Sequence, residues 1–97
     1  MATFVVLGSW TDEGARAARD TVKRAEVARE AARKLGGDIT HIWWTMGHYD
    51  LVAILEAPDD ETATAIMVAI SGSGMVRSET LRAFDAQALT GILAKVG

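Results

Sequence analysis

The sequence predicts one small α+β domain of split βαβ (βαββαβ) type, with a four-stranded antiparallel sheet and both helices on one of its faces. Three observations lead to this prediction. Four β-rich segments alternate with two helical segments in the order β, α, β, β, α, β. The second and third β-rich segments are joined by a short glycine-containing link. The chain has 97 residues, enough for one compact core and too few for two, so we expect a single domain over residues 1–97.

The first strand is expected over Thr3–Ser9, where β-branched and aromatic residues predominate. Both the odd-numbered and the even-numbered positions of this segment are apolar. This pattern is typical of a strand buried on both faces, so we place it in the centre of the sheet. A helical segment follows, with the hydroxyl of Thr11 as a cap and Gly36-Gly37 as its end. Because Asp20-Thr21 can cap a fresh start, we expect a break in the helix there.

The two runs Ile39–Met46 and Tyr49–Glu56 are expected to form a hairpin about Gly47-His48. A two-residue link that begins with glycine suits a type II′ turn, because glycine adopts a positive φ without strain. Pro58 then ends the second run of the hairpin.

The second half of the chain supplies one more helix, one more strand and a helical tail. Asp59 or Asp60 caps the helix, and a Ser/Gly loop ends it. The expected ranges are Glu61–Ile70, Met75–Phe84 and Ala86–Val96. Right-handed crossovers then give the strand order 4-1-3-2, which places the first strand in the centre, in agreement with its apolar pattern.

The hairpin also predicts which side chains share a face, because residues equidistant from the turn lie opposite each other and side chains alternate. The face expected under the helices is almost continuously apolar and carries Ile42, Trp44, Met46, Tyr49, Leu51, Ala53 and Leu55. The other face is mixed and carries Ile39, His41, Trp43, Thr45, Asp50, Val52, Ile54 and Glu56. A monomer would leave the apolar part of this mixed face exposed, so we expect a homo-oligomer.

The composition excludes several classes of function. The net charge is -3 and charged residues make up 24% of the chain, without the basic stripe that a nucleic-acid partner requires. The absence of cysteine excludes disulfides, thiolate metal sites and thiol nucleophiles. No apolar run approaches the roughly 18 residues that span a bilayer, so we expect no membrane partner and a cytoplasmic location.

The sequence Gly47-His48-Tyr49-Asp50, preceded by Thr45-Met46 and followed by an apolar strand up to Pro58-Asp59-Asp60, resembles the signature of the GYD-domain family. Further similarity lies at Trp10-Thr11-Asp12, Leu35-Gly36-Gly37, and Val76-Arg77 to Leu81-Arg82-Ala83-Phe84. The resemblance implies a ferredoxin-like dimeric α+β barrel, in which two sheets face each other, as a dimer or an assembly of dimers. Relatives by fold include cofactor-free monooxygenases, haem-degrading enzymes, isomerases and ligand-sensing modules, so fold alone implies no single activity.

Asp50 is the leading candidate site residue, because it begins the third strand on the mixed face, where a carboxylate needs a donor or a cation. We expect the third strand to run parallel to the first and the last strand to end at the same edge, so that Arg82 or the Thr45 hydroxyl can reach Asp50. Asp50 would then act as a fixed anion or as a proton acceptor. The alternative is a structural pair at the rim of the barrel.

His48 and Tyr49 are the other catalytic candidates. His48 in the turn is either a solvated loop residue or a mobile acid or base over a pocket mouth. Tyr49 is either a core residue on the helix side or a catalytic phenol. His41 and Trp43 share the mixed face, so we expect them to bind a ligand between two sheets, together with Thr45, Asp50 and Arg82.

The two histidines do not show a metal-ligand spacing, so we expect no metal and no cofactor, with haem ligation as the alternative. Lysines and arginines of the first helical segment alternate with acids and are interpreted as a solvated face. They are Arg16, Arg19, Lys23, Arg24, Arg29, Arg33 and Lys34.

Three functions fit these patterns. The first is a module that binds a small hydrophobic organic ligand between two sheets. The second is a cofactor-independent barrel enzyme of oxygenase or isomerase type. The third is a structural oligomeric protein.

Overall fold

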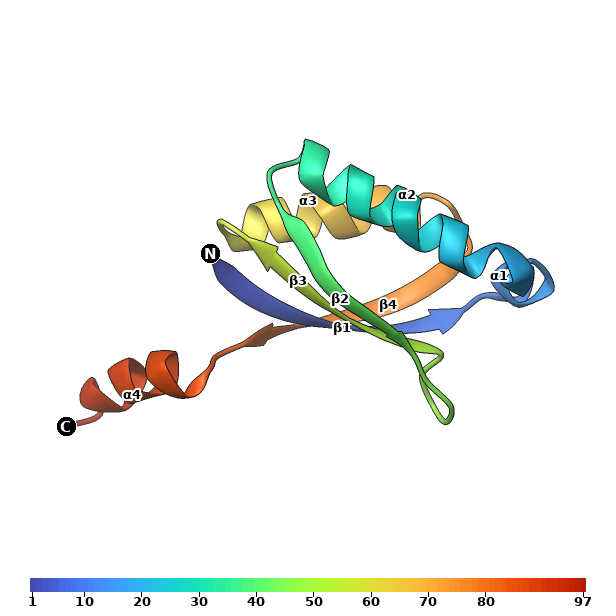
Figure 1. Ribbon diagram of the computed structural model, residues 1–97. Coiled ribbons are helices and arrows are strands. Elements are labelled where there is room, and N and C mark those ends of the chain that lie inside the picture. Colours follow the sequence, from blue (N-terminus) through green and yellow to red (C-terminus); the bar gives the residue numbers. More distant parts are fainter.

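The computed structural model describes all 97 residues as a four-stranded sheet with helices packed on one face (Figure 1). The strands are β1 (Ala2–Trp10), β2 (Asp38–Trp44), β3 (Leu51–Ala57) and β4 (Val76–Ala83). Their order is β2-β3-β1-β4, which is the predicted order 4-1-3-2 read from the opposite edge. Every neighbouring pair is antiparallel. The expectation that the third strand runs parallel to the first is therefore wrong, because the hairpin reverses the chain between β2 and β3.

The helical segments follow the predicted order, including the expected break. They are α1 (Asp12–Arg16), a 3-10 turn η1 (Ala18–Asp20), α2 (Thr21–Lys34), α3 (Asp60–Ser71) and α4 (Ala86–Ala94). The Thr11 hydroxyl caps α1 by accepting from the Gly14 N–H. The Asp59 carboxylate caps α3 in the same way, accepting from the Thr62 N–H at 2.7 Å. Figure 1 shows α2 and α3 side by side over the sheet.

One hydrophobic core lies between the sheet and the two covering helices. It consists of Phe4, Val6, Ile39, Ala53, Leu55 and Ala57 from the strands, and Ala32, Ala63 and Ile66 from the helices. Leu55 and Ile66 are completely buried. The predicted helix-facing side of β3 is therefore confirmed at Ala53 and Leu55. The central strand β1 is buried only on this side, at alternate residues, because its other face has no helix above it.

Ile39 was predicted on the mixed face and lies in the core instead. A β-bulge between Ile39 and His41 shifts the pairing, so that Ile39 faces Leu55 whereas His41 faces Ile54. A bulge inserts one unpaired residue, so Ile39, which precedes the bulge, lies on the opposite face from the one that uninterrupted alternation predicts. Ile39 is only 6% exposed, and burial of this isoleucine under the helices favours the shifted register.

The hairpin is longer than the predicted two-residue turn. The Thr45 N–H donates to the Asp50 carbonyl at 2.9 Å, which leaves a loop of four residues between them. Gly47 has a φ of 111°, as the prediction of a positive φ required. The register of Trp43 and Trp44 is unchanged, because Thr45 and Asp50 are also equidistant from the tip.

The C-terminal helix α4 lies apart from the rest of the molecule. Figure 1 shows α4 projecting beyond the end of β4, at the opposite end from α1. None of its residues is buried, although Leu89, Ile92 and Leu93 are apolar. The helix therefore has a hydrophobic surface that its own chain does not cover.

Candidate functional site

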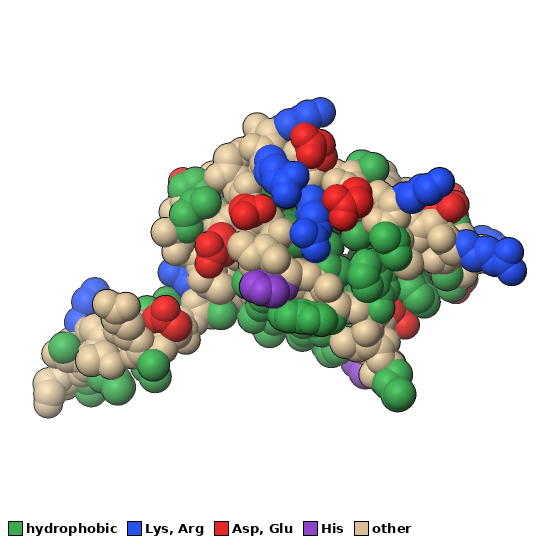
Figure 2. Space-filling model, viewed as in Figure 1, with side chains coloured by type: hydrophobic (Ala, Val, Ile, Leu, Met, Phe, Trp, Pro, Cys, Tyr) green, Lys and Arg blue, Asp and Glu red, His purple; other side chains and the backbone are tan.

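The face of the sheet opposite the helices, called the open face below, carries an apolar centre with polar residues around it. Its side chains, assigned from the strand register, are Thr3, Val5, Leu7, His41, Trp43, Val52, Ile54, Glu56, Arg77, Glu79 and Leu81. Trp43 is 51% exposed and Leu81 is 44% exposed. Figure 2, which views the sheet from the side, shows hydrophobic side chains along its lower edge, away from the helices. The predicted apolar patch is present without Ile39, which lies in the core.

His41 and Trp43 form a flat aromatic surface on the open face. Their rings stack with centroids 5.1 Å apart and planes 14° apart. The Nδ1 atom of His41 lies within hydrogen-bond distance of the Thr40 hydroxyl, at 3.0 Å. The structure thus brings together two of the five residues that the sequence predicted to bind a ligand.

Tyr49 reaches the open face, whereas the sequence predicted it under the helices. Its hydroxyl donates to Glu79 Oε1 at 3.3 Å, and Glu79 lies on the open face of β4. The strand alternation ends at Leu51, and the irregular loop before it redirects the Tyr49 side chain. His48 packs edge-on against Tyr49, with ring centroids 4.9 Å apart.

The neighbouring charge determines the chemistry of Tyr49. The negative charge of Glu79, together with partial desolvation and the hydrogen bond between them, raises the pKa of Tyr49 above its ordinary value. A phenol with a raised pKa stays protonated and acts as a hydrogen-bond donor. This environment does not favour the catalytic phenolate.

Asp50 has a structural partner, although not the predicted one. Its Oδ2 atom accepts the Trp10 N–H at 2.9 Å, and its own N–H donates to the Gly8 carbonyl at 2.8 Å. These bonds tie the end of β1 to the start of β3. The Thr45 hydroxyl donates to the Tyr49 carbonyl at 2.6 Å, which closes the hairpin loop.

Arg82 lies far from Asp50, so the predicted pair between them is wrong. Arg82 is opposite Phe4 in the register, whereas Asp50 bonds to Gly8 and Trp10 at the other end of β1. The guanidinium carbon of Arg82 lies 4.4 Å from the ring centroid of Phe84. Antiparallel pairing of β1 with both neighbours separates Arg82 from Asp50, because β4 ends where β1 begins.

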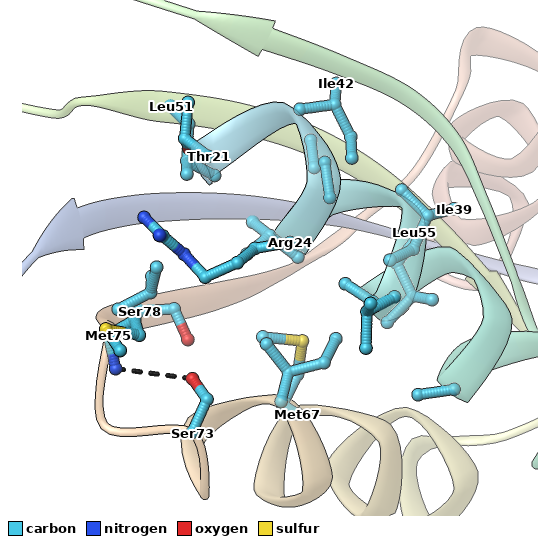
Figure 3. Close-up of a pocket in the computed structure, with 18 of the residues that line it drawn as sticks. Thr21, Arg24, Ile39, Ile42, Leu51, Leu55, Met67, Ser73, Met75 and Ser78 are labelled. Carbon is cyan, nitrogen blue, oxygen red and sulfur yellow. Dashed lines mark hydrogen bonds between the residues drawn. The ribbon is translucent and has the colours of Figure 1, made fainter. Parts of the chain in front are cut away.

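A cavity of about 230 Å³ lies between α2, α3 and the sheet, on the helix side. Sixteen of its twenty lining residues are hydrophobic. Figure 3 shows Ile39 and Leu55 toward one end, Met67 in the middle, and Thr21, Ser78 and the guanidinium of Arg24 toward the other end. This cavity lies within one chain, and the ligand space that the sequence predicts between two sheets stays a prediction.

Arg24 lines this cavity, whereas the sequence interpretation assigned it to a solvated face. Its Nη1 atom donates to the Ala17 carbonyl at 2.7 Å, and its Nη2 atom is buried without a partner. The signal was present in the sequence, since Thr21, Arg24, Ala28 and Ala31 recur at helical spacing along the apolar stripe. The charge of arginine favours a surface position, whereas its place on this stripe favours the cavity.

The structure contains no group of three or more His, Cys, Asp or Glu residues arranged to hold a metal ion. None of the helices has the length and apolar character needed to cross a membrane.

Comparison with known proteins gives the family. The model of the GYD domain matches residues 4–93, which is most of the chain. The chain belongs to the GYD-domain family. It is 34% identical over 84 residues to the glutamine synthetase and cystathionine beta-lyase binding protein of Thermus thermophilus, covering 86% of this chain and 88% of that protein.

A solved structure agrees with the fold of this GYD-domain protein. The crystal structure of TTHA0845 from Thermus thermophilus superimposes with a TM-score of 0.56 and 28% sequence identity. The match covers 89% of this chain and 96% of that chain. The α+β fold and the family predicted from the sequence are therefore confirmed.

Proposed function

We propose that this GYD-domain protein is a binding protein that forms a homodimer through its open face and acts by holding partner proteins. The apolar surface of the open face supports the homodimer. Val5, Leu7, Val52 and Ile54 are half-buried there, and Trp43 is half-exposed, with no helix above them. Contiguous apolar surface of this kind marks an interface, and an identical sheet is its natural complement in a two-fold dimer.

The exposed area of the chain supports the dimer. The chain exposes 6390 Å². A compact monomer of 10.4 kDa exposes roughly 5400 Å², so the excess is about 1000 Å². Each partner of a standard interface buries about 800 Å², which is close to this excess. A second copy that covers the open face together with the projecting helix α4 would therefore bury about this excess area.

Helix α4 accounts for part of the excess and extends the same surface. Figure 2 shows hydrophobic side chains on the lower side of α4, the side to which the open face is also turned. Leu93 is 58% exposed and Leu89 is 46% exposed. We therefore include α4 in the interface, in contact with the second copy.

Partner proteins form the second part of the proposal. The relative from Thermus thermophilus, of which this chain matches 88%, is named as binding glutamine synthetase and cystathionine beta-lyase. Enzymes of this class are the partners we propose for this chain. The hairpin tip is the contact that we assign to them, because Met46 is 94% exposed, and methionine adapts to a partner surface.

Sedimentation at micromolar concentration tests the dimer. The wild type is expected near twice 10.4 kDa, and Ile54→Lys near the monomer mass, because a charge replaces apolar contact area. Val22→Lys is the matched control, since Val22 is 60% exposed on α2 and this variant should remain dimeric. A wild type that sediments only as a monomer would overturn the dimer.

The proposed partners are tested with purified glutamine synthetase and cystathionine beta-lyase from the organism that encodes this chain. Each enzyme is immobilised, and retention of this chain is measured. At least one enzyme should retain the wild type, and Met46→Ser should weaken retention more than Val22→Ser does. If neither enzyme retains the wild type at micromolar concentration, the proposal of these partners fails, whatever the oligomeric state.

A small organic ligand between the two sheets is a second candidate, favoured by the flat stack of His41 on Trp43. Such a ligand would lie against this stack in the dimer. Binding of an aromatic probe to the wild type that is lost in both Trp43→Ala and the monomeric Ile54→Lys supports this candidate. Binding that survives in Ile54→Lys opposes it.

A further inference from the structure

We propose that the cavity between α2, α3 and the sheet binds a small monocarboxylate with an apolar body, whose carboxylate pairs with the guanidinium of Arg24. The cavity has a volume of about 230 Å³. An engineered protein cavity of roughly 150 Å³ with apolar walls holds benzene. The cavity here therefore has room for a body of that size and for a short polar arm.

The walls of the cavity separate an apolar end from a polar end. Ile39 and Leu55 lie at one end in Figure 3, and the Arg24 side chain extends from α2 toward the other. Thr21 and Ser78 lie at the same end as the guanidinium. An occupant that matches these walls has a hydrocarbon or aromatic body and a single polar head.

Arg24 defines the chemistry of the head. Its Nη2 atom is buried and has no hydrogen-bond partner, and Arg24 takes no part in the three ion pairs of the chain. No acidic side chain lines the cavity. A buried guanidinium donor without an acceptor is costly, and the planar guanidinium matches the two oxygens of a carboxylate. The structure therefore provides a cation for an anion that the chain itself does not supply.

The Thr21 hydroxyl adds a second donor beside Arg24. It accepts a hydrogen bond from the indole N–H of Trp44 at 3.0 Å, so its own proton is available to a second oxygen of the ligand. Arg24 is the only charged residue among the lining residues. One cation balances one negative charge, so a monocarboxylate fits better than a dianionic phosphate ester.

Calorimetric titration with octanoate as the probe tests this site. The wild type is expected to bind octanoate and to bind the neutral 1-octanol more weakly. Arg24→Gln should weaken octanoate binding by about 10- to 100-fold and leave 1-octanol binding unchanged, because only the charge-assisted bonds are lost. Arg29→Gln is the matched control on the same helix, because Arg29 is half-buried, pairs with Glu26 and does not line the cavity.

A second variant tests the place of binding independently of the charge. Ala28→Phe fills the cavity and should abolish binding of both probes, whereas Ala65→Phe on the exposed side of α3 should not. Circular dichroism checks that each variant is folded. The proposal is overturned if the wild type does not bind octanoate at millimolar concentration. It is also overturned if Arg24→Gln and the wild type bind octanoate equally.

Discussion

The two faces of β3 differ in what the chain does with equally apolar residues. Leu55 and Ala53 face the helices and are 0% and 5% exposed. Ile54 and Val52, their neighbours in the sequence, face the open side and remain half-buried. The helices of a chain of this length cover one face of the sheet only. Apolar patterning in this chain therefore specifies two different contacts, one within the chain and one that we assign to a second copy.

Replacing each of two adjacent residues with alanine tests this difference most strongly. Leu55→Ala should lower the free energy of unfolding by about 2–5 kcal/mol, because it creates a cavity in the core. Ile54→Ala should lower it by less than half as much and should instead weaken the dimer. Urea unfolding and sedimentation measure the two effects. Equal losses of stability at low protein concentration would contradict the distinction between the faces.

Asp50 joins the end of β1 to the start of β3 by hydrogen bonds, so its replacement tests whether its role is structural. Asp50→Ala leaves the Trp10 N–H without its acceptor and should cost about 1–3 kcal/mol. Asp50→Asn retains an oxygen acceptor, so it should cost less. Urea unfolding measures both variants. If Asp50→Asn is fully stable but loses partner binding, Asp50 acts as a functional anion.

The hairpin loop joins the strands that pair Trp43 with Val52 on the open face, so backbone strain in this loop should weaken their pairing. Gly47→Val should cost about 1–3 kcal/mol, because the φ of 111° is unfavourable for a β-branched residue. His48→Ala removes an exposed side chain and should change stability by under about 0.5 kcal/mol. Thermal unfolding of both variants measures the difference. If Gly47→Val melts with the wild type, the assigned loop conformation is wrong.

Titration of Tyr49, the only tyrosine of the chain, tests its contact with Glu79 on the open face. The raised pKa of Tyr49 means that the folded state retains the phenol proton longer, so stability should fall as the pH rises through the ordinary value of 10.0. Glu79→Gln should lower the pKa of Tyr49 toward that value, as measured by tyrosinate absorbance. A second copy over the open face increases desolvation, so the pKa should be higher in concentrated than in dilute solution. An unchanged pKa in Glu79→Gln would show that Glu79 is not the cause.

Most of the fold could be predicted from local patterns in the sequence. The alternation along β3, the caps Thr11 and Asp59 and the break before Thr21 each depend on neighbouring residues. The strand order follows from these elements and the handedness of crossovers. The family signature was visible for the same reason, since it lies in one continuous hairpin.

The candidate site could be predicted only in part. His41 and Trp43 share a face because they are two residues apart in one strand, and this the sequence determines. The partners of Asp50, Arg82 and Tyr49 come from other strands, at sequence separations of 30 to 79 residues. Their identity depends on strand direction and on irregular backbone, which side-chain patterns do not specify.

The elements, their order and the presence of an uncovered apolar face can be predicted from the sequence, because each follows from local periodicity and chain connectivity. Only the tertiary structure decided that Ile39 enters the core, since a bulge is a property of two paired strands. It also decided that Arg24 lies in a cavity without an acidic partner. Whether a charged side chain on a helix lies in solvent or lines a cavity depends on how closely the helix packs on the sheet. The spacing of residues along that helix does not specify this packing distance.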